Sequence, residues 1–425
     1  MSRPALDINL LDAAVARLPE DELTAARRAA LARFVASGFP TSAEEDWKYT
    51  NLEPAVAISN DGLGDAVATR PGKRDIAPPD LDAHWLVLHD GHVEASGVEA
   101  LRAAEHAVRL QRLGDTSTAD LLADDSLSAF NVALLEDGLR IEVADGESPA
   151  KPIALLLTGS SAKRLRQNRV LIDVGRDARL QLVEYHATAD DDSGFTNSVI
   201  EANLADGAEL DYVHIQQNGG EHVSVNRFHA RLGRDATLRH AGFDFGGRMT
   251  RNDLVADIAH TGASVQLLGL YLAGGRQHID NHTRVLHRVG PAHSDEEYRG
   301  ILNGAARCVF NGKAQVFEGA DGTDANQANH NLLLSERAEI DTKPELEIYA
   351  DDVKCSHGAT VGQLDADALF YLRARGLDAA EAQNILTRAF AAGTLARLPV
   401  DTVREHLEAA VDERLREILD TDDHA

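Results

Sequence analysis

The stretch DDVKCSHGAT, residues 351–360, contains two side chains that can bind a metal, the thiol of Cys355 and the imidazole of His357. In a β-strand both point to the same side and lie about 6–7 Å apart, so both can reach one metal ion or cluster. Two ligands do not complete a site, because structural metal sites usually have four. The missing ligands would come from elsewhere, for example from a second chain. The alternative is a buried cysteine beside a hydrogen-bonded histidine, continuing the apolar face of Val353.

A second group of histidines lies in RQHIDNHTRVLH, which contains His278, His282 and His287. In a strand, His278 and His282 share one face with Asp280, while Ile279 and the residues alternating with it share the other face. His278 and His282 would then lie about 13 Å apart, which is too far for both to bind one metal ion. The segment therefore predicts a solvated polar strand face rather than a metal site.

The common catalytic motifs are missing from the sequence. Gly312-Lys313 lacks the remaining residues of a P-loop, so we do not expect the chain itself to hydrolyse ATP. G-x-S-x-G, C-x-x-C and H-E-x-x-H are also absent. The remaining enzyme hypothesis is a carbohydrate-active β-helix protein that uses paired carboxylates, such as Asp295 with Glu296 or Glu297. Such enzymes are typically secreted and line their clefts with aromatic residues, which make up only 5% of this chain.

The composition is that of a folded, soluble protein, with 44% hydrophobic and 26% charged residues in a chain of 425. The net charge of −27 makes nucleic acid and anionic membranes poor partners. Two cysteines, Cys308 and Cys355, cannot form a disulfide framework, and the N-terminus has no continuous apolar run typical of a signal peptide. We therefore expect a cytoplasmic protein.

Four segments in the middle of the chain are similar to one another: VGRDARLQLVE, LADGAELDYVH, LGRDATLRHAG and HTGASVQLLGL. Each places a turn before an alanine, and Ala178, Ala208, Ala236 and Ala263 follow one another at spacings of 30, 28 and 27 residues. A period in this range indicates a repeat architecture. Each period contains two β-type runs and no long helix, which favours a coiled parallel β-solenoid. An antiparallel sandwich is the competing interpretation, because closely spaced turn signals also suit it.

Helical patterns flank this repeat on both sides. We divide the chain into an N-terminal helical and mixed region (1–150), the β-solenoid core (151–364) and a C-terminal helical domain (365–425). Asp378 and Glu381 form a capping-box-like helix start in the last region. In the first region, we expect Trp47 to dock on the domain surface.

Amide side chains gather just before the apolar run of residues 332–334. Asn326, Gln327, Asn329 and Asn331 are the residues concerned. Amides on successive coils of a solenoid can hydrogen-bond along a ladder, which is a structural use. No catalytic acid or base is needed to explain them.

Several motifs resemble the SufB/SufD family, the scaffold subunits of the SUF iron–sulfur cluster assembly system, and the SufD branch most closely. They are EEDWKYTNL, RGIL with AARCVFNGKAQV, NQANHNLLLSERAEIDTKPELEIYADDVKCSHGATVGQLD, and LFYLRARGL. The long run from Asn326 to Asp365 is highly specific, and the other motifs occur in the order of the family. Together they cover nearly the whole chain.

The resemblance implies a mainly β fold with a right-handed parallel β-helix core between helical terminal regions, in agreement with the repeat. It also implies a non-catalytic scaffold subunit of a heteromeric complex. This subunit would pair with a SufB-like subunit through the ends of the β-helices and bind a SufC-like ABC-type ATPase through its C-terminal helices. The ATPase partner would then hydrolyse the nucleotide.

Within the family motif, the SufD histidine implicated in the nascent cluster matches His357, and the nearby cysteine matches Cys355. The resemblance thus implies a transient iron–sulfur cluster against these residues at the subunit interface. Flavin binding is associated with the assembled complex, but no flavin site can be identified in the sequence. SufB-type scaffolds carry additional cysteines, and this departure favours SufD and makes a partner necessary. A homodimer of the isolated chain and a free-standing structural solenoid stay open.

Overall fold

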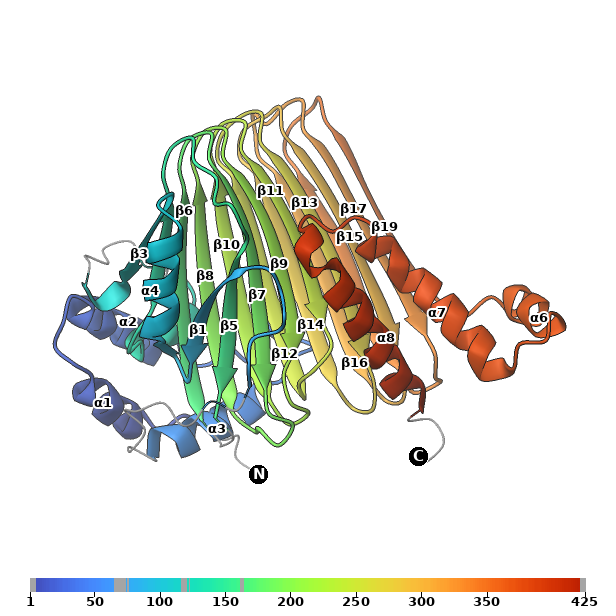
Figure 1. The fold of residues 1–425 in the computed structure, drawn as a ribbon, viewed down its shortest axis with the longest axis horizontal. Coiled ribbons are helices and arrows are strands. Elements are labelled where there is room, and N and C mark those ends of the chain that lie inside the picture. The colour runs from blue at the N-terminus through green and yellow to red at the C-terminus, as the bar shows by residue number, and fades with distance from the viewer. Residues whose placement is uncertain are drawn as a thin grey trace.

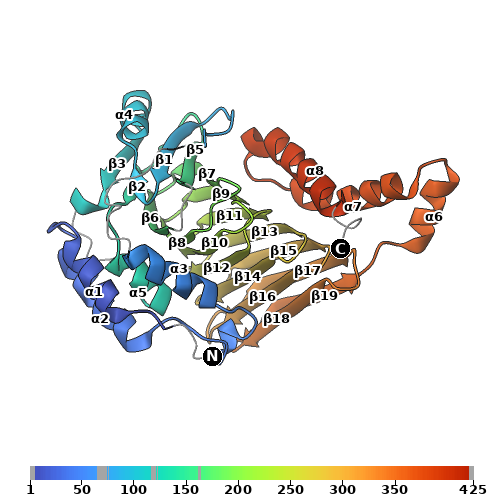
Figure 2. The ribbon, with the colours of Figure 1, turned by 90° about the horizontal axis from the view of Figure 1, so that it is seen from below.

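The computed structural model describes residues 5–64, 74, 76–115, 121, 123–160 and 164–420. Two large sheets face each other and form a parallel β-solenoid of about eight turns, with helices toward both ends of the chain (Figures 1 and 2). Strands account for 41% of the chain and helices for 27%, so the predicted fold class, a mainly β solenoid between helical regions, is confirmed.

Consecutive strands of the solenoid alternate between the two sheets. The ten-stranded sheet contains, in spatial order, β19 (Lys354–Gly362), β17 (Asp324–Leu333), β15 (His293–Leu302), β13 (Ser264–Ala273), β11 (Thr237–Asp244), β9 (Glu209–Gln217), β7 (Arg179–Thr188), β5 (Ile153–Gly159), β1 (His84–His89) and β2 (His92–Val93). The nine-stranded sheet contains β18 (Glu339–Ile348), β16 (Arg307–Val316), β14 (His278–His287), β12 (Met249–Ile258), β10 (Val223–Leu232), β8 (Phe195–Leu204), β6 (Leu165–Val174), β4 (Leu139–Val143) and β3 (Val108–Arg112).

Within each sheet, the solenoid strands pair in parallel with the strand of the neighbouring turn. Arg179 of β7 pairs with Glu209 of β9, and Glu209 pairs with Thr237 of β11, steps of 30 and 28 residues. These steps are the period of the sequence repeat. The antiparallel pairs in the described part of the chain are β1–β2 and β3–β4, at the N-terminal end. The parallel pairing excludes the antiparallel sandwich.

The repeated alanines mark one corner of the solenoid. Ala178, Ala208, Ala236 and Ala263 are all fully buried there. The residue before each alanine has a positive φ: 54° at Asp177, 70° at Gly207, 56° at Asp235 and 79° at Gly262. Glycine and aspartate tolerate this left-handed conformation better than most residues do. The turn geometry therefore explains why Asp-Ala or Gly-Ala recurs once per turn.

Alternate side chains of each strand face the interior of the solenoid, and the others face outward. On the ten-stranded sheet, Leu180, Leu210, Leu238 and Val265 form one inward row in register. The outward side chains of the same sheet pack against α7 (Ala379–Leu395) and α8 (Arg404–Asp420), which lie across this sheet in Figure 1. The capping box that opens α7 is present, with Asp378 and Glu381 bonded reciprocally.

The remaining helices gather at the N-terminal end of the solenoid, except α6, which projects at the opposite end (Figures 1 and 2). They are α1 (Ile8–Arg17), α2 (Thr24–Ser37), α3 (Glu53–Gly64), α4 (Ala95–Ala104), α5 (Ser126–Ala133) and α6 (Ala366–Ala374). Short 3-10 turns are η1 (Glu45–Trp47), η2 (Leu113–Asp115) and η3 (Asp401–Val403), the last of which leads into α8. Among the described residues, none of the helices combines the length and apolarity needed to cross a bilayer.

The outer face of β12 and β14 is covered by the N-terminal segment. Trp47 docks there as predicted, with the guanidinium of Arg251 4.1 Å from its ring centroid. Thr50 Oγ1 lies 2.7 Å from His278 Nε2 and also bonds the fully buried Asp280. The prediction of a solvated polar face is therefore wrong for this part of β14, because a distant segment of the chain covers it.

Candidate functional site

The C-terminal end of the solenoid is open. β18 and β19 are the last strands of the two sheets, and within the described residues no further strand pairs with either of them (Figure 2). β19 is exposed along most of its length, and β18 is half-buried. Ile348, Tyr349 and Val361 are 41%, 62% and 50% exposed at this end. An uncovered strand edge with apolar side chains is a surface that can pair with another chain.

Cys355 and His357 both lie on β19, on the side that continues the solenoid interior. Cys355 is in register with Ala325 of β17, which is in register with Ser294 of β15. Ser294 is in register with Val265, so Cys355 continues the inward row described above. His357 is in register with Gln327, which is in register with Glu296. Glu296 is buried and accepts a hydrogen bond from Thr283 of the facing sheet, so this row points inward. The predicted pair is thus brought together at the mouth of the interior, where Cys355 is half-buried and His357 is exposed.

Two acidic groups near this end have raised pKa values because burial disfavours their charged forms. Burial raises the pKa of the Cys355 thiol, against a weaker opposing hydrogen bond from the backbone of Ala325. Burial also raises the pKa of Glu296 to about 7, although the Thr283 hydroxyl opposes this. A metal bound by Cys355 would therefore have to stabilise a thiolate that the isolated chain keeps protonated.

The second cysteine does not join this site. Cys308 lies on β16 of the nine-stranded sheet, in register with Ile279 and Ile340, and is fully buried. Burial raises the pKa of its thiol far above the usual value. Cys308 is therefore a core residue in this structure, and the open end offers one thiol and one imidazole.

Of the carboxylates in the enzyme hypothesis, Glu296 points away from the other two. Glu296 faces the interior, whereas Asp295 and Glu297 face outward and both form ion pairs with Arg397. Glu297 also pairs with Arg299. The outward carboxylates hold the segment after α7 against β15, so they act as a structural contact and not as an acid–base pair around a substrate.

The amide side chains before residues 332–334 form structural hydrogen bonds, but these bonds do not make the expected ladder from coil to coil. Asn329 Nδ2 donates to Tyr271 Oη at 3.1 Å and to the Tyr298 carbonyl at 3.2 Å, and Asn331 Nδ2 donates to Asn329 Oδ1 at 2.5 Å. Asn326 lies on the outer face, where its Oδ1 accepts a bond from Ser356.

A continuous amide ladder runs elsewhere in the interior, on the nine-stranded sheet. Asn226 Nδ2 donates to Asn252 Oδ1 at 2.9 Å, and Asn252 Nδ2 donates to Asn281 Oδ1 at 2.8 Å. The sequence reasoning placed Asn281 on the strand face of Ile279, opposite the predicted solvated face, but missed this ladder.

His287 is also an interior residue. Its Nε2 lies 2.9 Å from Ser294 Oγ. Burial, with a smaller contribution from His293, lowers the pKa of His287 to about 4. Its imidazole is therefore neutral near pH 7 and is used in packing.

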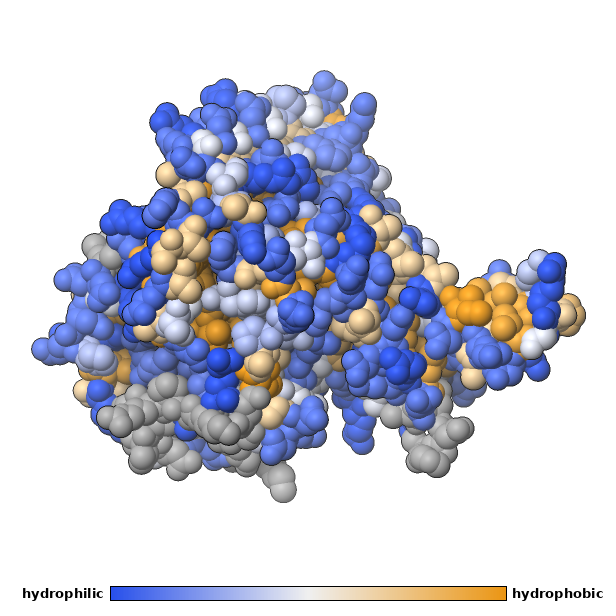
Figure 3. Space-filling view, in the orientation of Figure 1, coloured by the Kyte–Doolittle hydropathy of each residue, from blue (hydrophilic) through white to orange (hydrophobic). Residues whose placement is uncertain are grey.

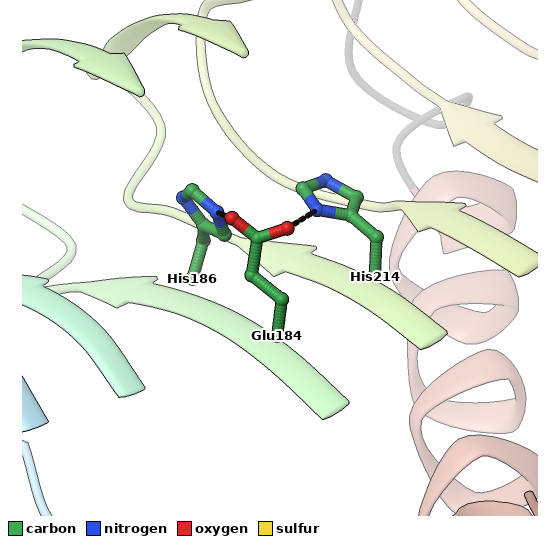
Figure 4. Close-up of side chains that lie close together, drawn as sticks. All are labelled: Glu184, His186 and His214. Atoms are coloured by element: carbon green, nitrogen blue, oxygen red, sulfur yellow. Dashed lines mark hydrogen bonds and ion pairs between the residues drawn. The ribbon is translucent and has the colours of Figure 1, made fainter. Parts of the chain in front are cut away.

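One group of potential metal ligands was missed by the sequence reasoning. Glu184 and His186 of β7 and His214 of β9 lie together in the interior (Figure 4), and their ligand atoms are all within 4.8 Å of one another. His186 Nε2 is 2.7 Å from Glu184 Oε1, and His214 Nδ1 is 3.0 Å from Glu184 Oε2. Within the described residues this is the one such group of three. The sequence contains the information needed to find this group, because the 30-residue repeat puts His214 in register with Glu184.

The charge state of this group follows from its burial. Burial raises the pKa of Glu184, but the imidazoles of His186 and His214 together outweigh burial and hold the pKa well below its usual value. For His214, burial is outweighed by Glu184, and the pKa is raised. For His186, burial prevails and lowers the pKa. The group is thus a buried carboxylate with one imidazole that favours the charged form and one that favours the neutral form.

The fold and the open end together define a class: a parallel β-solenoid that ends in uncapped strands presenting a thiol and an imidazole. Residues 156–390 match the family described as "SUF system FeS cluster assembly, SufBD core domain". The chain is 30% identical over 395 residues to the iron–sulfur cluster assembly protein SufD of Escherichia coli, covering 91% of each chain. It is 27% identical to the SufBD family protein slr0076 of Synechocystis, covering 92% of this chain and 91% of the relative.

A third relative, the SufD protein of Bacillus subtilis, is 25% identical over 81% of this chain and 78% of its own length. The chain therefore belongs to the SufB/SufD family, in its SufD branch. It is an iron–sulfur cluster assembly protein of the SUF system.

Proposed function

We propose that this chain is a non-catalytic scaffold subunit that pairs, through the open end of its solenoid, with a SufB-like subunit and presents His357 and Cys355 to the cluster formed between them. The observation that carries the proposal is the position of these residues on the last strand of the ten-stranded sheet, which pairs with β17 on one side and, within the described residues, has a free edge on the other. Iron–sulfur clusters usually take four protein ligands, and this end supplies at most two. The partner would supply the others, and the cluster is the cargo of the complex.

The proposed pairing uses the free edges of β18 and β19. Backbone N–H and C=O groups at a free edge can bond to a strand of another chain, which would continue both sheets across the interface. The exposed side chains of Ile348, Tyr349 and Val361 would be buried by the same contact. In such an interface the inward row that ends at His357 would face the interior of the partner.

The proposed ATPase-binding surface is the projecting region of α6 and α7. Phe370, Tyr371 and Ile385 are 74%, 57% and 45% exposed. Apolar surface is visible on this projection in Figure 3. A SufC-like ABC-type ATPase would cover these side chains, and its motions would reach the solenoid through α7, which packs on the sheet.

Co-expression with SufB-like and SufC-like proteins of the same organism tests the proposal. We expect one complex on gel filtration that contains all three proteins together with iron and sulfide. Replacement of Phe370 by Asp should remove the ATPase and leave the SufB-like subunit bound, because a charge would then be buried in an apolar contact.

The matched control is Val35→Asp, since Val35 on α2 is also exposed, at 45%, but lies at the N-terminal end. The control should retain both partners. A chain that purifies alone or only as a homodimer, or retention of the ATPase by the Phe370 variant, would contradict the proposal.

A further inference from the structure

The buried group of Glu184, His186 and His214 is far from the open end. From β7 to β19 there are six steps between neighbouring strands, which at about 4.8 Å each give roughly 29 Å. All three side chains are buried. The group is therefore separate from Cys355 and His357, and the proposed cluster site gives it no role.

The interior around this group holds two buried carboxyl groups, and among the described contacts the nearby cation is the imidazole of His214 when it is protonated. Glu184 and Asp244 are both buried. Glu184 is bonded by the two imidazoles and by Tyr212, and Asp244 is bonded by Asn252, with no lysine or arginine among the contacts described for either. Two carboxylates in a dry interior are costly unless a cation compensates them. A divalent ion would balance both of them.

The donor atoms suit a first-row transition metal. Two imidazole nitrogens and one carboxylate form the set that binds iron(II) or zinc in proteins, with metal–ligand distances of about 2.0–2.2 Å. The ligand atoms around such an ion lie about 3–3.5 Å apart, as follows from those distances. Glu184 already lies 2.7 Å from His186 Nε2 and 3.0 Å from His214 Nδ1. All three ligand atoms lie within 4.8 Å of one another, so binding would need the two imidazoles to approach each other by at most about 1–2 Å.

The residues that surround Glu184 and His214 are of the kind that orient ligands in metal sites. Ligating histidines usually direct their second ring nitrogen to a carboxylate or carbonyl. His214 Nε2 is buried, has no hydrogen-bond partner and faces Asp244 Oδ1 at 3.8 Å. Tyr212 Oη donates to Glu184 Oε2 at 2.5 Å, which fixes the carboxylate. This arrangement would orient both Glu184 and His214 toward one ion.

An interior cavity adjoins the ligands. Its volume is about 30 Å³, and Glu184, His214, Asp244 and Asn252 are among the residues that line it. Apolar side chains make up much of its wall, but these four polar residues line it too, so a cavity of this size can hold a water molecule beside them. The space therefore provides the further coordination position that three protein ligands leave open.

We propose that Glu184, His186 and His214 bind one divalent first-row transition metal ion inside the solenoid. The ion would neutralise the buried carboxylates and tie β7 to β9. This site would exist in the isolated chain, and neither the partner subunits nor His357 would be needed for it.

The test uses the full chain without a polyhistidine tag, produced in medium supplemented with Co²⁺ so that the ion can enter during folding. We expect about one Co²⁺ per chain after removal of loose metal, with visible absorption bands of a nitrogen- and oxygen-bound cobalt. Glu184→Gln and His214→Gln should each reduce the bound metal at least about tenfold. His357→Ala should retain it, so failure of the cluster proposal would leave this result intact.

Thermal unfolding gives the second measurement. Because the ion binds the folded chain, the cobalt-loaded wild type should unfold at a higher temperature than the metal-free protein, and the two glutamine variants should show no such difference. Absence of stoichiometric metal in the wild type would overturn the proposal and leave the group as a buried carboxylate–histidine network. Equal metal content in wild type and in both variants would overturn it too.

Discussion

Replacing His357 by alanine should lower the iron and sulfide recovered with the reconstituted three-protein complex by about tenfold. Mutation of residues around a bound metal typically reduces metal affinity by about tenfold or more. The reason is that His357 is the exposed imidazole at the mouth of the interior, on the strand that is proposed to face the SufB-like subunit. The complex itself should still form, because many other residues of β18 and β19 contribute to the contact. Iron and acid-labile sulfide per complex, with visible absorption, are the measurements.

The matched control is His330→Ala. His330 lies on the neighbouring strand β17 and faces outward, where its Nδ1 is 2.9 Å from Thr360 Oγ1. This variant also removes an imidazole near the end of the solenoid, but not one on the inward side. It should assemble the cluster like the wild type. An unchanged yield in His357→Ala, or an equal loss in both variants, would reject the role assigned to His357.

Replacing Arg251 by alanine should reduce the free energy of unfolding by about 3–5 kcal/mol, because it leaves a buried carboxylate without its partner. Arg251 is 2% exposed and its Nη1 donates to Asp280 Oδ2 at 2.6 Å and to the Asp46 carbonyl at 2.7 Å. Its Nη2 donates to Asp253 at 2.8 Å, and its guanidinium lies over Trp47. One side chain thus joins the N-terminal segment to the solenoid. Urea unfolding at constant pH measures the loss.

The loss of unfolding free energy in Arg251→Ala should also depend on pH. In the wild type, burial tends to raise the pKa of Asp280, but Arg251 and His282 outweigh it and hold the pKa well below the usual value. A carboxyl group with a lowered folded-state pKa contributes stability that is present above its ordinary pKa and is lost as the pH falls toward the lowered value. Arg251→Ala removes the largest part of this contribution, so the difference in unfolding free energy between wild type and variant should be larger at pH 7 than at pH 3.

Arg284→Ala is the control for Arg251→Ala. Arg284 also contacts Asp46, at 3.3 Å, but both side chains are about half exposed. A surface pair of this kind contributes little, so we expect a change of about 0.5 kcal/mol or less. Similar losses in the two arginine variants would contradict the importance given to the buried contact.

The solenoid was predictable because its cause is local. Four successive turns have a residue with positive φ followed by a small buried residue, and the pairs Asp177-Ala178 and Gly207-Ala208 record this pattern in the sequence. The alternation of side chains between the two faces of β14 was also predictable, because strand geometry alone puts Ile279 and Asn281 on one face. The parallel arrangement followed from the spacing between turns.

Contacts between a solenoid strand and a segment distant in the sequence could not be predicted from the repeat. Asp280 is buried by Thr50, which is 230 residues away in the sequence, and no periodicity links the two. The contact between Glu184 and His214 joins neighbouring turns, so alignment of the repeats could have found it. That Cys355 and His357 share one side of a strand followed from their spacing. That this strand is the uncovered last one required the structure, and their role as cluster ligands stays a prediction.

The most direct test of the central claim is amide hydrogen exchange on the isolated chain and on its complex with the SufB-like subunit. We predict that exchange slows by at least about tenfold in β18 and β19 on complex formation, because free edges gain hydrogen-bonded partners. The strands at the N-terminal end of the solenoid, β1 and β3, should be unaffected. Unchanged exchange in Glu339–Ile348 and Lys354–Gly362, with protection appearing elsewhere on the chain, would contradict the account.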